Sequence, residues 1–258
     1  MDNNSFNIEN VKWSIGERGL YEAYYKLKIP SVSTILAECV PDPEYDAFVQ
    51  AVGAEKAKKI MEAAGQRGTS MHAFIEHFIE RTNETKDPSA VLLEIQKSVP
   101  ALLKEQQIPE DKINEGLDLF YKFYYCEYAN IYKNVYGIEL SLYSSSAFYR
   151  GKLDIAYISG PFLNITDFKT SNEKIKKGSI KEKKYKLQLG GYAYALDEML
   201  LLEGKSVNSC NILCINKKDD FIQNIVCEGD ELEENKQEFK TLCIEWHKKN
   251  NQEFIFNK

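Results

Sequence analysis

The sequence lacks any run of apolar residues that could cross a bilayer, since a transmembrane helix needs about 20 of them in succession. Its opening stretch, MDNNSFNIEN, is polar and acidic, and so lacks the basic and apolar regions of a targeting signal. We therefore expect no membrane partner, no secretory or mitochondrial targeting signal in the sequence as it stands, and a cytoplasmic location.

Closely spaced cysteine pairs are also absent. The six cysteines occupy positions 39, 126, 210, 214, 227 and 243, so no C-x-x-C motif occurs. A disulfide framework is not expected in a chain of this length without a signal peptide. Cys210, Cys214 and Cys227 lie in apolar, β-prone stretches, where a free cysteine packs as a small core residue. An iron–sulfur cluster with Cys39 as a distant fourth ligand is the alternative, which the spacing disfavours.

Acidic residues outnumber basic ones, with 39 Asp and Glu against 33 Lys and Arg. The resulting net charge of −6 argues against a general nucleic-acid binder. Residues 169–186 are an exception, with eight lysines and two glutamates, a net +6 that leaves −12 for the rest of the chain. Such a stretch suits a phosphate backbone, and Lys176, Lys177, Lys183 and Lys184 are the candidate DNA-binding residues. The alternative is a solvated loop that points away from any substrate.

The order of predicted segments indicates an α/β fold in a single domain spanning residues 1–258. Residues 1–136 are mainly helical, with helices over about 42–64 and 69–81 separated by a break at Gly65 and Gly68. A further helix over 111–135 is rich in aromatics, which at helical spacing are core residues or, alternatively, platforms for stacked bases. Residues 137–258 form a catalytic α/β core: three strands, a helix over about 185–202, two strands and a last helix. We expect a mixed β-sheet flanked by helices, with the N-terminal helices as an elaboration of this core.

The stretch 151–169, GKLDIAYISGPFLNITDFK, has the pattern of a β-hairpin. Alternation along its second strand puts Asp167 and Lys169 on one face and Phe168 on the other. Asp154 lies on the partner strand, where it can face Asp167, and two facing carboxylates repel each other unless a cation such as a divalent metal lies between them. Lys169 would then orient the attacking water or neutralise charge in the transition state of phosphodiester cleavage. The alternative is a surface ion pair between aspartate and lysine.

Histidine is rare, with three residues in the whole chain. His72 lies at the edge of the apolar stripe of the helix over 69–81, and on its own it reads as a partly buried histidine bonded to a backbone carbonyl. His77 lies about 140° around that helix from His72, so the two cannot form a metal-binding pair. We expect His77 and His247 to be surface residues.

The ordered combination of motifs resembles the PD-(D/E)XK nuclease superfamily, and within it the RecB-like exonuclease branch. The motifs are Asp154, then Asp167-Phe168-Lys169, then Gln188-x-x-x-Tyr192, preceded by Gly68-Thr69-Ser70-Met71-His72. The stretch PSVSTIL at 30–36 is similar to a motif of the mitochondrial genome maintenance exonuclease family and its phage and bacterial relatives. Leu153 stands where the superfamily name has proline, a departure that is common in this branch.

This resemblance implies a restriction-endonuclease-like core and a set of residue roles. Asp154, Asp167 and the Phe168 carbonyl would hold Mg²⁺ or Mn²⁺, with His72 as an additional ligand and Glu139 as a nearby acidic residue. Lys169 would position the attacking water. Gln188 and Tyr192 would line the path of the DNA.

The function predicted from this resemblance is that of a metal-dependent DNA exonuclease that prefers single strands with free ends, in replication, recombination or repair. The alternatives are a structure-specific or restriction-type endonuclease on the same fold, and a non-catalytic DNA-binding accessory protein. No Walker motif is present, so any unwinding would come from a helicase, and a recombinase or a single-strand-binding protein is a further possible partner.

Overall fold

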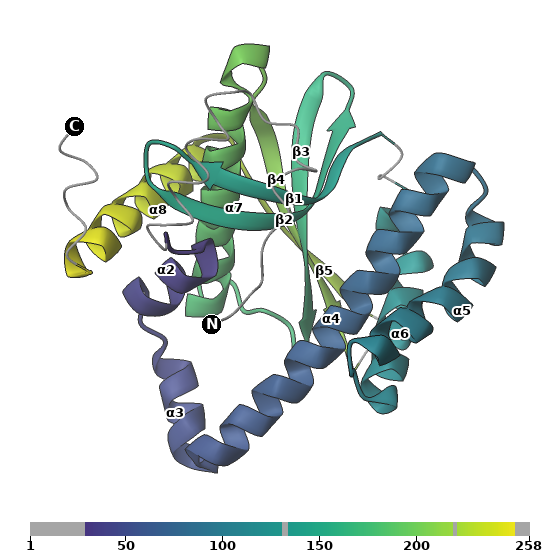
Figure 1. The fold of residues 1–258 in the computed structure, drawn as a ribbon. Helices are drawn as coiled ribbons and strands as arrows, with labels where there is room; N and C mark the ends of the chain where they lie inside the picture. The colour runs from purple at the N-terminus through teal and green to yellow at the C-terminus, as the bar shows by residue number, and fades with distance from the viewer. Residues whose placement is uncertain (1–28, 131–133, 219–220, 251–258) are drawn as a thin grey trace.

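A five-stranded β-sheet with helices on both faces organises the chain, whose computed structural model describes residues 29–130, 134–218 and 221–250 (Figure 1). The strands follow one another across the sheet in sequence order: β1 (Val135–Ser144), β2 (Tyr149–Ser159), β3 (Phe162–Ser171), β4 (Val207–Asn216) and β5 (Ile222–Glu228). All neighbours are antiparallel except β3 and β4, which are parallel. The predicted mixed sheet flanked by helices is therefore confirmed.

One face of the sheet is covered by α7 (Ile180–Met199), α8 (Gly229–Lys249) and α2 (Val32–Cys39) (Figure 1). Parallel neighbours need a crossover connection, and α7 provides it between β3 and β4. Hydroxyl side chains start two of these helices: Ser31 accepts from the Thr34 N–H of α2 and Ser179 from the Glu182 N–H of α7. Because the crossover follows directly after β3, residues of α7 lie beside the end of that strand.

The opposite face packs against α4 (Ala54–Thr85) and α6 (Glu110–Tyr124), and α5 (Pro88–Glu105) packs on these two helices. A short 3₁₀ helix, η2 (Glu127–Asn130), follows α6. A second 3₁₀ helix, η3 (Leu201–Glu203), follows α7. Phe74, Phe120 and Phe168 are fully buried in this second core, in which the rings of Phe74 and Phe120 stack with centroids 5.8 Å apart. The predicted core role of the aromatics is confirmed for Phe120 and Phe123, whereas Tyr125 is exposed and Tyr132 lies outside the described residues. The helix ends at Tyr124 rather than continuing to 135.

The predicted break at Gly65 and Gly68 is wrong. Helix α4 runs without interruption through both glycines, and the chain turns instead at Gly53, with a φ of 84°, between α3 (Pro43–Val52) and α4. A glycine inside a helix costs only about 1 kcal/mol relative to alanine, which the helix formers around it and the packing of the second half of α4 outweigh. Helix α3 has no buried residue and extends away from the sheet together with the start of α4 (Figure 1).

The expected surface position of His247 is also wrong. Its side chain is fully buried, and its Nε2 lies 3.0 Å from the Phe148 carbonyl oxygen, because this side of α8 packs against the end of the β1–β2 ribbon. His77 is half-buried, with Nδ1 2.8 Å from the Ala73 carbonyl oxygen of its own helix. Cys210, Cys214 and Cys227 are buried free thiols, as predicted. Among the residues that the structure describes, no helix combines the length and apolarity that a bilayer crossing requires.

Candidate metal centre and active site

The candidate site lies where strands β2 and β3 separate. Their antiparallel pairing ends at Ile155 and Thr166, and Asp154 and Asp167 are the next residues on the two strands. Beyond that point the Asp154 carboxylate replaces the missing strand partner, because its Oδ2 accepts a hydrogen bond of 2.6 Å from the Phe168 N–H. The fork therefore holds a buried carboxylate against the backbone of β3, at the position that the hairpin pattern predicts.

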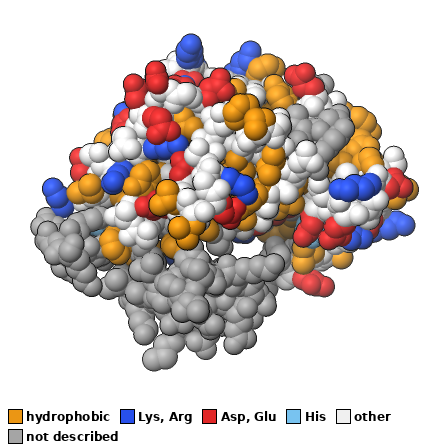
Figure 2. All heavy atoms as spheres, turned by 90° about the horizontal axis from the view of Figure 1, so that it is seen from above, with side chains coloured by type: hydrophobic (Ala, Val, Ile, Leu, Met, Phe, Trp, Pro, Cys, Tyr) orange, Lys and Arg blue, Asp and Glu red, His pale blue; other side chains and the backbone are white. Residues whose placement is uncertain are grey.

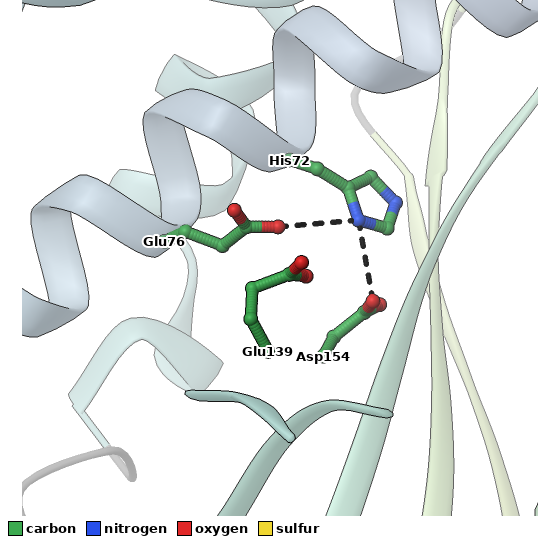
Figure 3. A group of neighbouring side chains, drawn as sticks. All are labelled: His72, Glu76, Glu139 and Asp154. Atoms are coloured by element: carbon green, nitrogen blue, oxygen red, sulfur yellow. Dashed lines mark ion pairs between the residues drawn. The ribbon is translucent and has the colours of Figure 1, made fainter. Parts of the chain in front are cut away.

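His72 reaches this fork from α4. Its Nε2 lies 2.9 Å from the Phe168 carbonyl oxygen, and since a carbonyl only accepts, Nε2 carries the hydrogen. In the neutral ring the lone pair is then on Nδ1, which lies 3.4 Å from Asp154 Oδ1 and 3.7 Å from Glu76 Oε1 (Figure 3). The ring thus presents a nitrogen ligand towards two carboxylates.

Four side chains meet here: the ligand atoms of His72, Glu76, Glu139 and Asp154 all lie within 4.8 Å of one another (Figure 3). Glu139 comes from β1, where its neighbours Ile138 and Leu140 pair with the two residues that flank Asp154. Its φ is 53°, a left-handed backbone conformation that costs free energy for a residue other than glycine and that recurs at functional sites as well as in turns. Glu139 also forms an ion pair with Lys152 of β2.

Burial and neighbouring charges shift the pKa values of Asp154 and His72 in opposite directions. Burial acts to raise the pKa of Asp154, but the charge and hydrogen bond of His72, together with Lys169, hold it below its usual value. Burial acts to lower the pKa of His72, but the charge of Asp154 and hydrogen bonds to Asp154 and Glu76 raise it to about 10. His72 therefore carries a second proton, and its positive charge balances the negative charge of the carboxylates. A bound metal cation would take over this role.

Asp167 and Lys169 lie together on the other side of the strand from Phe168, as alternation along β3 predicts. Asp167 is 2% exposed, and its Oδ2 lies 2.5 Å from Lys169 Nζ. Burial raises the pKa of Asp167 to about 6, with Lys169 lowering it and the charge of Asp154 raising it further. Burial acts to lower the pKa of Lys169, but the charges of Asp167 and Asp154 raise it above its usual value, so the amine is a cation at neutral pH.

Helix α7 completes this side of the site. Gln188 Nε2 donates to Asp167 Oδ1 at 3.3 Å and to the Tyr192 hydroxyl at 2.7 Å. Tyr192 is buried, and a Cβ on Gly151 would lie 2.8 Å from its ring, so Tyr192 packs against β2. The structure therefore brings Gln188 to the carboxylates and gives Tyr192 a supporting position behind it.

The lysine-rich stretch is only partly a loop, because α7 begins at Ile180 and not at about 185 as predicted. Lys176 and Lys177 are exposed in the connection after β3, but α7 already begins at Ile180 because Ser179 caps it. Lys183 and Lys184 therefore lie on the helix, 2.8 Å from Glu238 and 3.0 Å from Asp42 in ion pairs. Figure 2 shows the molecule from above, which is the end of the sheet opposite to the start of α7, and there basic and acidic side chains are interspersed.

A cleft of about 530 Å³ opens onto three residues of the cluster, His72, Glu76 and Glu139, and Gly65, Gly68 and Lys152 are also among its lining residues. A Cβ on Gly65 would meet no atom within 4 Å, and one on Gly68 would meet only Thr170 Oγ1 at 4.0 Å. The face of α4 that leads to His72 is therefore bare, and a substrate backbone can approach it closely.

The residues present fit a divalent metal. Three carboxylates and one imidazole nitrogen form an oxygen-rich donor set, the type that Mg²⁺ and Mn²⁺ prefer. In addition, the buried Asp167 carboxylate lies beside the cluster, with Oδ2 2.5 Å from Lys169 Nζ and Oδ1 accepting from Gln188. The Phe168 carbonyl, the other predicted ligand, accepts from His72 in this arrangement.

Glu76 is the site residue that the sequence reasoning missed. It lies four residues after His72, one helical turn further along the same face of α4, so its spacing from a candidate ligand was the available signal.

Comparison with known proteins identifies the family. The model of the PD-(D/E)XK nuclease superfamily matches residues 44–256. Among solved structures, the crystal structure of a "Putative exonuclease" from Eubacterium rectale is similar, with 14% sequence identity, a TM-score of 0.46, and coverage of 72% of this chain and 68% of that chain. No curated protein sequence matches.

Proposed function

Because the chain belongs to the PD-(D/E)XK nuclease superfamily, we propose that it is a Mg²⁺- or Mn²⁺-dependent deoxyribonuclease that removes nucleotides from free ends of single-stranded DNA. The observation that carries this proposal is the cluster at the fork of β2 and β3, in which Asp154 is buried and His72, Glu76 and Glu139 are half-buried. There His72 turns an imidazole nitrogen towards the carboxylates of Glu76 and Asp154.

His72, Asp154, Glu76 and Glu139 would hold the metal, with Asp167 adjacent to them. When bound, such a metal lowers the pKa of a coordinated water and screens the charge of the phosphate. The protein prepares the ligands in advance: the Phe168 N–H fixes Asp154, and the Phe168 carbonyl fixes the tautomer and orientation of His72.

Lys169 is the proposed catalytic cation. Its amine is held by Asp167 and lies 5.9 Å from the centre of the Tyr185 ring, so its direction is set from two sides. A protonated amine in this position can donate a hydrogen bond to the attacking water or to a phosphate oxygen as negative charge develops there. Gln188 supports the arrangement by holding the second oxygen of Asp167.

The DNA strand would run from the cleft along α4 towards the connection after β3. Lys176 and Lys177 are exposed there and can contact phosphates. Lys183 and Lys184 would contribute less, because a phosphate must compete with the carboxylates of Glu238 and Asp42. Unwinding of duplex DNA in replication, recombination or repair would require a partner such as a helicase.

The decisive experiment compares linear and circular single-stranded DNA of one sequence, with and without Mg²⁺ or Mn²⁺. We expect metal-dependent release of nucleotides from the linear strand and no cleavage of the circle. Lys169→Met should abolish cleavage and leave DNA binding nearly unchanged, because the lysine acts mainly in the transition state. Lys205→Met is the matched control, since that lysine is exposed and pairs with Glu203 far from the fork.

Other results would contradict the proposal in different ways. Cleavage of the circular strand would identify an endonuclease on the same fold. DNA binding without any cleavage, under all metal conditions, would identify an accessory protein. Normal turnover by Lys169→Met would remove the fork of β2 and β3 from consideration as the active site.

A further inference from the structure

Lys152 is an exposed cation of the cleft at the fork that the proposed mechanism does not use. Among the described residues that line this cleft it is the one lysine, and none is arginine. It projects from β2, and its side chain is 65% exposed. Lys169, the proposed catalytic cation, lies elsewhere, since it contacts Asp167 and the Tyr185 ring of α7. A phosphate that enters the cleft would therefore find in Lys152 a second cation that can reach it.

The Lys152 ammonium is paired with one of the proposed metal ligands. Its partner is Glu139 of β1, whose carboxylate belongs to the cluster of ligand atoms that lie within 4.8 Å of one another. Ile138 and Leu140 pair with the residues on either side of Asp154, so Glu139 stands opposite Asp154, and Lys152 precedes Asp154 by two residues. The Glu139 carboxylate therefore has two neighbours, the ligand set on one side and the ammonium on the other.

The ion pair between Lys152 and Glu139 is of a kind that exchanges easily. Exposed ion pairs contribute little to stability, because water solvates both charges and the long side chains lose freedom when they pair. A divalent cation carries twice the charge of an ammonium and binds carboxylate oxygens directly. Because like charges repel, a metal at the cluster and Lys152 would compete for Glu139.

The charge of the cluster supports such an exchange. Glu76, Glu139 and Asp154 bring three carboxylates together, and Lys152 offsets the charge of one of them. A bound divalent metal would supply two positive charges at the same place, so Lys152 would no longer be held there. Its flexible four-carbon stem allows the ammonium to turn to another anion in the cleft, and the backbone phosphate of a DNA strand is such an anion.

We propose that Lys152 is a phosphate-binding residue that the metal releases. Before a metal binds, it pairs with Glu139; once Glu139 holds the metal, it turns to the phosphate next to the scissile one. This inference rests on the proposed function and deepens it, because it makes the binding of the metal and of the DNA strand cooperative. Such coupling is reciprocal, so the strand also strengthens the binding of the metal. The alternative is an ordinary cross-strand ion pair that takes part in neither event.

The test measures two affinities in the Lys169→Met background, in which we expect the strand to stay intact. Calorimetric titration gives the affinity for Mn²⁺ without DNA, and fluorescence anisotropy gives the affinity for a single-stranded oligonucleotide with and without Mn²⁺. Adding Lys152→Met should raise the Mn²⁺ affinity about threefold, because the metal no longer competes with an ion pair. With Mn²⁺ present, it should lower the DNA affinity about threefold and the salt slope of log K by about 0.7.

Controls separate this effect from a general loss of positive charge. Lys205→Met is the matched control, since it removes an exposed lysine that pairs with Glu203 and is not among the described lining residues of the cleft. It should leave the Mn²⁺ affinity unchanged, and without Mn²⁺ Lys152→Met should weaken DNA binding no more than this control does. Glu139→Gln frees Lys152 without a metal, so it should strengthen metal-free DNA binding about threefold, and adding Lys152→Met should cancel that gain.

The outcomes distinguish this inference from the proposed function. A Mn²⁺ affinity that Lys152→Met leaves unchanged or lowers would overturn the inference, as would a loss of DNA affinity that is equal with and without Mn²⁺. In cleavage assays, Lys152→Met in the otherwise wild-type chain should raise KM about threefold and affect kcat little, because it removes binding that is equal in the ground and transition states. Wild-type cleavage of linear strands with the same KM for Lys152→Met would overturn the inference alone. A wild-type protein that binds no Mn²⁺ would overturn both proposals.

Discussion

Two glycine-to-alanine substitutions inside helices should change stability in opposite directions. Gly65→Ala in α4 places a methyl group where no atom lies within 4 Å, so only the gain in helix propensity, about 1 kcal/mol, applies. For a chain of this size that gain raises the melting temperature by roughly 2–4 °C. Gly116→Ala in α6 has the same propensity gain but a different environment.

At Gly116 the packing of α6 on α4 leaves no room for a methyl group. The added Cβ would lie 2.8 Å from Met71 N and from the Ser70 carbonyl carbon, and closer still to Ser70 Cβ. Backbone atoms cannot rotate away, so the two helices must separate, and overpacking of this kind costs about 1–3 kcal/mol. After the propensity gain is subtracted, we expect a net loss of up to about 2 kcal/mol in the free energy of unfolding.

The same displacement should affect the site, because α4 carries His72. If α4 moves outward, the 2.9 Å contact between His72 Nε2 and the Phe168 carbonyl lengthens and the ligand set is disturbed. Urea denaturation in metal-free buffer measures the stability change, and calorimetric titration with Mn²⁺ measures the metal affinity, which should fall for Gly116→Ala and stay constant for Gly65→Ala. An increase in the melting temperature of both variants would refute the packing argument.

Three further expectations concern the proposed site. Burial lowers the pKa of His72, but the neighbouring carboxylates outweigh this effect and raise it to about 10. Mn²⁺ must therefore displace a proton from His72 when it binds. The apparent affinity for Mn²⁺ should then rise roughly tenfold per pH unit between about pH 7 and 9. Isothermal titration at several pH values measures this slope, which His72→Asn should flatten; a flat wild-type profile would contradict it. Glu76→Gln should raise the metal concentration needed for half-maximal cleavage about tenfold, and no change would exclude Glu76 from the metal site. Replacing Lys176 and Lys177 with alanine should reduce the salt slope of log K for single-stranded DNA by about 1.4, since each phosphate contact contributes about 0.7, whereas the ion-paired lysines of α7 should change it less.

Local sequence patterns predict the site correctly where its contacts are between residues close together in the chain. The hairpin pattern predicts that Asp154 and Asp167 face each other, because register in a hairpin follows from the turn and the alternation of side chains. The position of His72 could not be derived in this way. Its contact with the Phe168 carbonyl joins residues 96 apart in the chain, and only the motif resemblance pointed to it.

The glycine and lysine patterns led to wrong predictions of where helices begin and end, for two different reasons. Gly65 and Gly68 look like helix breakers when viewed alone, but the packing of the rest of α4 outweighs their low propensity. The lysines at 181–186 look like a solvated loop, yet Ser179 caps a helix there and Asp42 and Glu238 pair with two of them. The packing that outweighs the glycines comes from segments far away in sequence, whereas the Ser179 cap is a local signal that the lysine pattern concealed.

The fork of β2 and β3 also determines when a newly made chain can become active. Its side chains come from α4, β1, β2, β3 and α7, and no contiguous segment contains them all. The parallel pairing of β3 with β4 closes only after the whole of α7 has been synthesised, and such non-local contacts form late in folding. Lys169 of β3 and Gln188 of α7 therefore reach their final places only when this pairing closes, whereas the proposed ligands His72, Glu76, Glu139 and Asp154 come from elements that precede it. Any loosening of α4 from the sheet would move His72 and Glu76 away from Asp154, so we expect the proposed hydrolysis to depend on the integrity of the entire fold.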